Sequence, residues 1–146
     1  MREALALARE AAAAGEVPVG CVIELDGEVV ARGTNRTLRD ADPTAHAEMV
    51  ALRAAAQHCG DFRLEGARLF VTVEPCLMCL GAILLARIAA VHYGCAEPKS
   101  GAVTSRFQLA GHERLRKLAV HRGLLEEECC SLLSEFFADL RRERSR

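Results

Sequence analysis

The chain has 146 residues, of which 51% are hydrophobic and 27% are charged, a composition typical of one globular domain with a buried core. This composition excludes a disordered chain. The 19 Lys and Arg residues nearly balance the 20 Asp and Glu residues, and the formal net charge of -1 indicates neither a nucleic acid nor a membrane as partner.

The seven cysteines are an odd number, and charged residues at positions 9 and 10 break the apolar start of the chain, unlike a secretion signal. These features predict free thiols or metal ligands in a reducing compartment, and hence a cytoplasmic protein. The longest apolar run, residues 77–91, is interrupted by Arg87 and is shorter than the about 18 residues that a membrane span requires. We therefore expect no membrane partner.

Hydrophobic periodicity predicts a chain in which helices and strands alternate. In chain order the expected elements are a helix at 2–14, strands at 19–25 and 28–32, a helix from 42 to about 59, a strand at 67–73, a helix at 76–86, strands at 89–93 and 118–121, and a helix at 125–142. Asp26-Gly27 predicts a hairpin turn between the first two strands. Asp42-Pro43 predicts the N-cap and first residue of the second helix. The alternation indicates one α/β domain over 1–146, with an antiparallel hairpin added to a largely parallel sheet.

Three residues of the metal-ligating type stand at the starts of two predicted helices. His46 precedes Glu48 at the second helix, while Cys76 and Cys79 open the third helix on one face. A helix N-terminus stabilises a thiolate. Two thiolates and one imidazole suit zinc, and three protein ligands leave the fourth tetrahedral position to water, which indicates a catalytic site.

Glu48 lies two residues from His46, so its side chain projects in a different direction and need not bind the metal. Zinc lowers the pKa of its bound water to about 7. A carboxylate beside that water can take its proton and pass it to a substrate atom. The pattern therefore predicts a hydrolytic reaction.

Two other interpretations of the cysteine pair remain open at this point. The site could be a structural zinc site completed by a fourth ligand, Cys59, His92 or Cys95, or the pair could be a redox pair like that of thioredoxin. The redox interpretation leaves His46 and Glu48 unexplained. The other histidines are expected at the surface or in packing, and the five cysteines other than Cys76 and Cys79 are expected to be free thiols.

With these motifs placed, the sequence resembles the zinc-dependent cytidine deaminase-like superfamily. Within it, the sequence is similar to the bacterial tRNA-specific adenosine deaminases over nearly its whole length. The residues that carry the resemblance are 17–20 (VPVG), 35–36 (NR), 42–48 (DPTAHAE), 74–79 (EPCLMC), 81–82 (GA), 93–94 (YG), 99–102 (KSGA) and 134–137 (SEFF). The resemblance implies a three-layer α-β-α fold with a mixed sheet of roughly five strands.

The resemblance also implies the chemistry and the partners. Zinc would be held by His46, Cys76 and Cys79, and hydroxide on the zinc would attack C6 of adenine. Glu48 would be the catalytic proton shuttle, and inosine and ammonia would be the products. The implied substrate contacts are Asn35, the Pro75 carbonyl, Ala47 and Phe137. The substrate would be the wobble adenosine of a tRNA anticodon stem-loop, and the enzyme would be a homodimer whose partner helps to line each site.

Two alternatives to this function stay open. The motifs fix the reaction but are shared with deaminases of free nucleobases, nucleosides or nucleotides, of the cytosine or guanine type. The chain could also be a noncatalytic, zinc-stabilised RNA-binding module, although such a module has no need of Glu48. Basic residues outnumber acidic ones in 101–123 and 136–146, so the near-zero net charge is a cancellation between segments and these two segments are candidate phosphate contacts.

Overall fold

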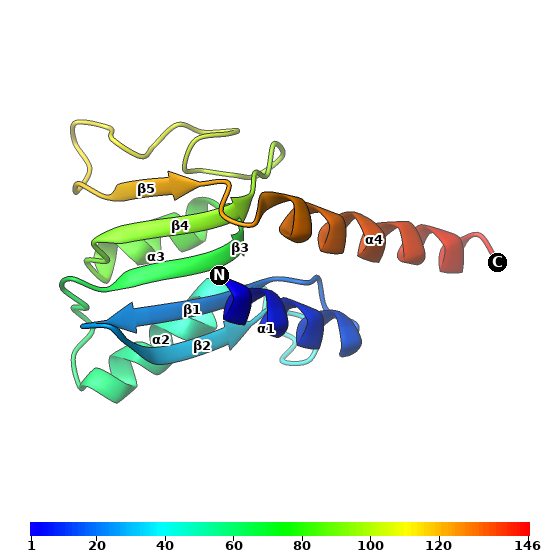
Figure 1. The fold of residues 1–146 in the computed structure, drawn as a ribbon, viewed down its shortest axis with the longest axis horizontal. Helices are drawn as coiled ribbons and strands as arrows, with labels where there is room; N and C mark the ends of the chain where they lie inside the picture. The colour runs from blue at the N-terminus through cyan, green and yellow to red at the C-terminus, as the bar shows by residue number, and fades with distance from the viewer.

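The computed structural model describes residues 1–146 and contains a five-stranded sheet and four helices (Figure 1). Its elements are α1 (Arg2–Ala13), β1 (Gly20–Leu25), β2 (Glu28–Thr34), α2 (Ala47–Cys59), β3 (Arg68–Val73), α3 (Leu77–Leu85), β4 (Ala90–Cys95), β5 (Ala119–Arg122) and α4 (Glu126–Arg144). Every predicted helix and strand is present. The ends agree within two residues except at the start of α2.

The sheet is mixed, as predicted, with the strand order β2-β1-β3-β4-β5. β1 runs antiparallel to both of its neighbours, whereas β3, β4 and β5 are parallel to one another. Because β2 and β3 are both antiparallel to β1, β2 points the same way as β3. The carboxyl ends of β2, β3, β4 and β5 therefore meet at one edge of the sheet.

Helices cover both faces of the sheet, which gives the three-layer α-β-α architecture (Figure 1). One face packs against α2 and α3 through a fully apolar core that includes Ile23, Leu69, Val71, Leu80 and Ile83. Burial of each such side chain contributes roughly 1.5–3 kcal/mol relative to leaving it exposed. On the other face lie α1 and α4, which the glycines of the sheet allow to approach closely: a Cβ on Gly20 would strike the backbone of α1, and one on Gly94 would strike Cys129 of α4.

The second helix begins at Ala47, later than predicted from Asp42-Pro43. The Asp42 carboxylate accepts hydrogen bonds from the backbone N–H of Thr44 (2.8 Å) and from its hydroxyl (2.7 Å). The Asp42 side chain thus closes a turn over two residues instead of capping a helix. As a consequence His46, not Asp42, occupies the N-cap of α2.

The prediction that all cysteines outside the metal motif are free thiols is wrong for two of them. Cys95, at the end of β4, and Cys130, in α4, form a disulfide with their Cα atoms 5.2 Å apart. Residues 35 positions apart in sequence can meet in this way only after α4 has packed beside β4, so the pairing is not visible in cysteine spacing. Cys21, Cys59 and Cys129 are free, as expected.

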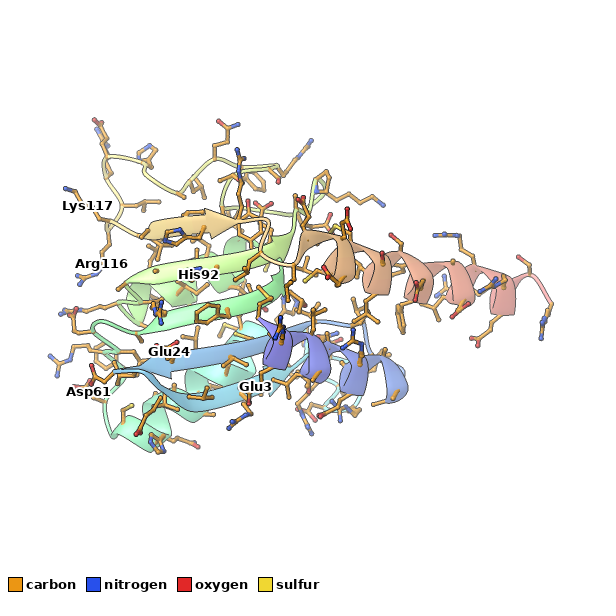
Figure 2. The ribbon with its side chains drawn as sticks, in the orientation of Figure 1. Glu3, Glu24, Asp61, His92, Arg116 and Lys117 are labelled. Atoms are coloured by element: carbon orange, nitrogen blue, oxygen red, sulfur yellow. A yellow bond between two sulfur atoms is a disulfide. The ribbon has the colours of Figure 1, made fainter.

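His92 packs on the part of the sheet that α1 and α4 leave uncovered (Figure 2). Its ring stacks between Phe70, at 4.5 Å between centroids, and His121, at 4.4 Å. Burial lowers its pKa. This position is consistent with a packing residue. None of the four helices combines the length and the hydrophobicity needed to cross a membrane.

Candidate active site

The edge at which the parallel strands end carries a cavity of about 260 Å³. Asn35 directly follows β2, Glu74 directly follows β3, and Glu97 comes two residues after β4, so the topology brings three distant segments to the cavity wall. Ligands of open α/β sheets bind at this edge, beyond the carboxyl ends of the strands. The cavity also reaches the starts of α2 and α3 through His46 and Cys76.

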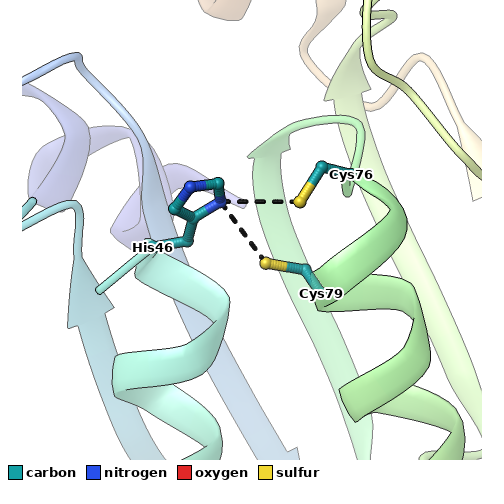
Figure 3. A group of neighbouring side chains, drawn as sticks. All are labelled: His46, Cys76 and Cys79. Atoms are coloured by element: carbon teal, nitrogen blue, oxygen red, sulfur yellow. Dashed lines mark hydrogen bonds between the residues drawn. The ribbon is translucent and has the colours of Figure 1, made fainter. Parts of the chain in front are cut away.

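His46 and Cys76 hold equivalent positions, since each is the N-cap of its helix. Both have extended backbone, with ψ of 154° at His46 and 177° at Cys76, and neither side chain forms a capping hydrogen bond. Their side chains are therefore free to turn toward one another. Cys79 lies in the first turn of α3, and Figure 3 shows its sulfur beside that of Cys76, facing the His46 ring.

The separations of these atoms fit a tetrahedral zinc ion. His46 Nδ1 lies 3.6 Å from Cys76 Sγ and 3.6 Å from Cys79 Sγ, and all three ligand atoms lie within 4.8 Å of one another. Zn–S bonds of about 2.3 Å and Zn–N bonds of about 2.0–2.1 Å at a tetrahedral angle place N and S about 3.6 Å apart. The donor set and its spacing thus match the metal that the sequence predicted.

The three residues that could have completed a structural zinc site as a fourth ligand do not lie beside His46, Cys76 and Cys79. Cys95 is held in the disulfide, His92 is stacked on the sheet, and Cys59 is exposed at the far end of α2. The metal-ligating group therefore consists of His46, Cys76 and Cys79 alone. A set of three protein ligands leaves a coordination position for a water molecule, which is the arrangement of catalytic zinc sites.

Hydrogen bonds among the three ligand side chains shift the pKa of each of them. Hydrogen bonds from Cys79 and His46 lower the pKa of Cys76 to about 4, and the hydrogen bond with Cys76 raises the pKa of His46. The hydrogen bond between the Cys79 thiol and Cys76, together with burial, raises the pKa of Cys79 far above its ordinary value. Zinc binds cysteines as thiolates, so the lowered pKa of Cys76 favours metal binding, whereas Cys79 must lose its proton when the metal binds.

Glu48 lies one residue inside α2 and lines the cavity beside His46 and Cys76. Only 4% of it is exposed, and this burial raises the pKa of its carboxyl to about 7. It does not belong to the metal-ligating group. A carboxyl that titrates near neutral pH and faces the cavity without binding metal can accept a proton and release it again during one reaction.

Three of the four expected substrate contacts line the cavity, namely Asn35, Ala47 and Phe137. Pro75 is the exception, because it is buried away from the cavity lining and its carbonyl accepts the backbone N–H of Ala102 at 2.9 Å. The Pro75 carbonyl therefore already has an intramolecular partner. α4 contributes a further lining residue, Leu133, to which the sequence interpretation gave no role.

Two buried carboxylates, those of Glu16 and Glu74, hydrogen-bond the backbone of segments that line the cavity. The sequence alone indicated no function for either residue. Glu16 is fully buried and accepts the backbone N–H groups of Leu38 (3.2 Å) and Arg39 (2.7 Å), and it also takes a longer hydrogen bond from the Asn35 amide (3.5 Å). Glu16 thus orders the segment that carries Asn35. Its only sequence signal is its place directly before the 17–20 motif.

Glu74 organises the opposite wall. Its carboxylate accepts backbone N–H groups of Glu97, Val103, Thr104 and Ser105, and it also accepts the Ser105 hydroxyl. These hydrogen bonds keep its pKa below the usual range even though burial acts in the opposite direction. The next residues along the chain are Pro75 and Cys76, so Glu74 couples a zinc-ligand segment to the loop that faces it.

Comparison with known proteins agrees with this geometry. Residues 1–95 match the family model of the cytidine and deoxycytidylate deaminase zinc-binding region. The tRNA-specific adenosine deaminase of Bacillus subtilis is 43% identical over 145 residues, covering 99% of this chain and 90% of the relative. The tRNA-specific adenosine deaminase of Haemophilus influenzae is 44% identical over 146 residues, covering 99% of this chain and 84% of the relative.

Solved structures show the same likeness. A structure from a study of A-to-I editing by tRNA:A34 deaminases at the wobble position of transfer RNA superimposes with a TM-score of 0.88 at 45% identity, over 91% of this chain and 97% of the other. A guanine deaminase from Nitrosomonas europaea superimposes with a TM-score of 0.83 at 26% identity, over 94% of this chain and 82% of the other. The chain belongs to the zinc-binding cytidine and deoxycytidylate deaminase family, together with the tRNA-specific adenosine deaminases.

Proposed function

We propose that the protein converts adenosine to inosine at the wobble position of a tRNA anticodon loop. The observation that carries the proposal is the cavity in which the zinc-ligand set and Glu48 face one another, in a chain 43–44% identical to tRNA-specific adenosine deaminases over nearly its full length. The single sheet, whose strands extend from residue 20 to residue 122, supports treating 1–146 as one deaminase domain.

In this proposal, separate residues bind the metal, transfer protons and contact the substrate. His46, Cys76 and Cys79 would hold zinc, and the bound metal would supply a water molecule that is nucleophilic near neutral pH. Glu48 would take a proton from the attacking water and deliver it to N1 of adenine as the water oxygen bonds to C6. Glu48 would then move the proton of the new C6 hydroxyl group to the C6 amine, so that the C6–N bond breaks, ammonia leaves and the C6 carbonyl of inosine forms. Asn35, Ala47 and Phe137 contact the flipped nucleoside.

An anticodon loop suits this cavity because its bases are already unpaired, so extruding one costs little. Binding the loop also requires cations for its phosphates. A surface hollow at the end of α4 is lined by Arg141, Arg142 and Arg146 together with Ser145, and it supplies such cations on the helix that contributes Leu133 and Phe137 to the cavity.

A homodimer is part of the same proposal. The outer face of α3 bears Leu77, Gly81 and Leu85 at helical spacing, and the two leucines are 51% and 75% exposed. Exposed leucines in a row are typical of a surface that another protein covers. A second copy on this face would border the site, because α3 starts at the zinc ligand Cys76.

Leu85→Glu is expected to convert the dimer to monomers, since a buried unpaired charge opposes association. Sedimentation should show the dissociation constant of the dimer rising by about 100-fold or more. Leu124→Glu, at an exposed leucine outside α3, is the matched control and should sediment like the wild type. A wild-type protein that is monomeric at micromolar concentration would contradict the dimer.

A cytoplasmic location is proposed as well. Its support is the set of free thiols Cys21, Cys59 and Cys129 beside the two zinc-ligand cysteines, because free thiols persist in a reducing compartment. The Cys95–Cys130 disulfide fits this location only as a reversible bond.

The decisive experiment offers the purified zinc-loaded protein an anticodon stem-loop with a wobble adenosine, alongside free adenine, guanine, cytosine and their nucleosides, and detects products by mass spectrometry. We expect inosine at the wobble position and no rapid turnover of the free compounds. Turnover of guanine or cytosine with none on RNA would instead support a free-base deaminase, in line with the likeness to guanine deaminase. Binding of RNA without any product would support a noncatalytic module.

A further inference from the structure

The disulfide lies on the face of α4 that lines the cavity. Cys130, Leu133 and Phe137 are spaced by three and four residues, so they project from one side of the helix. Leu133 and Phe137 line the cavity, and Cys130 bonds to Cys95. The cross-link therefore fixes the part of α4 that forms a cavity wall.

The other cysteine of the disulfide, Cys95, lies next to the segment that carries the zinc ligand Cys76. Cys95 is the last residue of β4 and pairs with Val73 of β3. Its carbonyl accepts the backbone N–H of Glu74 at 2.8 Å, two residues before the ligand Cys76. The bond thus ties the cavity wall in α4 directly to the strand ends that carry the zinc-ligand segment.

Noncovalent packing of α4 is concentrated at its start, where Cys129 packs with Leu5 and Cys95. Of the 19 residues of α4, only Cys129 is buried, and Phe137 is 40% exposed. The C-terminal turns of the helix extend past the edge of the sheet (Figure 1). An element with so little buried apolar surface opens at low free energy unless a covalent bond restrains it.

We propose that Cys95 and Cys130 form a reversible thiol–disulfide site that positions α4 and thereby controls capture of the substrate. This inference rests on the proposed function for its effect on RNA, whereas the state of the thiols and the mobility of α4 can be measured without RNA.

The neighbouring cysteines favour exchange at this pair. Cys130 is partly exposed, whereas Cys95 is 7% exposed, so an external disulfide reaches Cys130 first. Cys129 packs against Gly94, and its burial raises the pKa of its thiol to about 11. A thiol that stays protonated is a poor nucleophile, so Cys129 does not compete for either partner.

The oxidant is a small-molecule disulfide such as glutathione disulfide. The Cys130 thiolate attacks one of its sulfurs, which forms a mixed disulfide and releases one glutathione thiolate. The Cys95 thiolate then attacks the Cys130 sulfur and releases the second. Two protein thiols lose two electrons and two protons, and glutathione disulfide becomes two glutathione thiols. Excess thiol reverses both steps.

The first test measures the pair and the helix without RNA. Zinc-loaded protein is equilibrated with glutathione disulfide or with a phosphine reductant, and its zinc content is checked after each treatment. We expect a peptide cross-linked through Cys95 and Cys130 in the oxidised sample only. Amides of α4 should exchange hydrogen about tenfold faster after reduction, and those of α2 should not change. Two free thiols in the oxidised sample, or equal exchange in α4, would overturn the inference.

The second test measures capture of an anticodon stem-loop. Reduction should raise KM by about threefold to tenfold and change kcat less, because loss of α4 positioning weakens binding before it affects Glu48. Cys130→Ser should show the high KM under both conditions, and Cys59→Ser, at an exposed free cysteine, should respond like the wild type. An unchanged KM would overturn control of capture. No inosine from any form would refute the proposed function, while the hydrogen-exchange result would still decide the thiol–disulfide site.

Discussion

Glu48→Gln is expected to abolish deamination while the protein keeps about one zinc per chain. The amide fills the same space beside His46 and Cys76 but cannot take a proton from water or deliver one to adenine. General acid–base catalysis by one positioned group contributes about 10²- to 10⁴-fold, and Glu48 would act in two proton transfers, so a loss of at least about 10³-fold in kcat is expected. Inosine formation on a stem-loop and metal analysis measure the two effects.

Glu10→Gln, which removes an exposed carboxylate of α1, is the control and should retain full activity. RNA affinity of Glu48→Gln should remain close to that of the wild type, because Glu48 is assigned to chemistry and not to binding. A variant that loses zinc and unfolds would show a structural role for Glu48, and a variant that still forms inosine would exclude the proposed proton shuttle.

Cys76→Ala is expected to lose zinc and to lower the thermal stability of the protein. It leaves only His46 and Cys79 from a set whose atoms are spaced for tetrahedral binding. A metal present at about 1,000 times its dissociation constant stabilises the folded state by about 4 kcal/mol. In a chain of this size each kcal/mol corresponds to about 2–4 °C in Tm, so the loss should be about 10 °C.

A chelator provides the matched comparison for this variant. Chelation should lower the Tm of the wild type to that of Cys76→Ala and leave the variant unchanged, because the variant has no metal to lose. Cys59→Ala, at an exposed cysteine remote from the site, should keep both zinc and Tm. Zinc bound to Cys76→Ala at wild-type affinity would show that another group completes the metal site.

Much of the site was predictable because its chemistry is concentrated in short segments. His46 and Glu48 lie two residues apart, and Cys76 and Cys79 lie three apart, so each pair can be recognised from its spacing alone. The start of α2 was misplaced because an Asp before a Pro serves equally well as a helix cap or as a turn residue. In the folded chain Asp42 binds Thr44, and only this outcome puts His46 at the N-cap.

By itself, the sequence determined the alternation of helices and strands, the hairpin at Asp26-Gly27 and the zinc-ligand types, because these depend on neighbouring residues and on fixed helical or strand periods. Only the tertiary structure decided the Cys95–Cys130 bond, the wall carboxylates Glu16 and Glu74, and the intramolecular partner of the Pro75 carbonyl. The physical reason is that each of these depends on which distant segments the strand order brings to the same edge of the sheet. No local period records that order, and packing of the two helical layers onto the sheet fixes it.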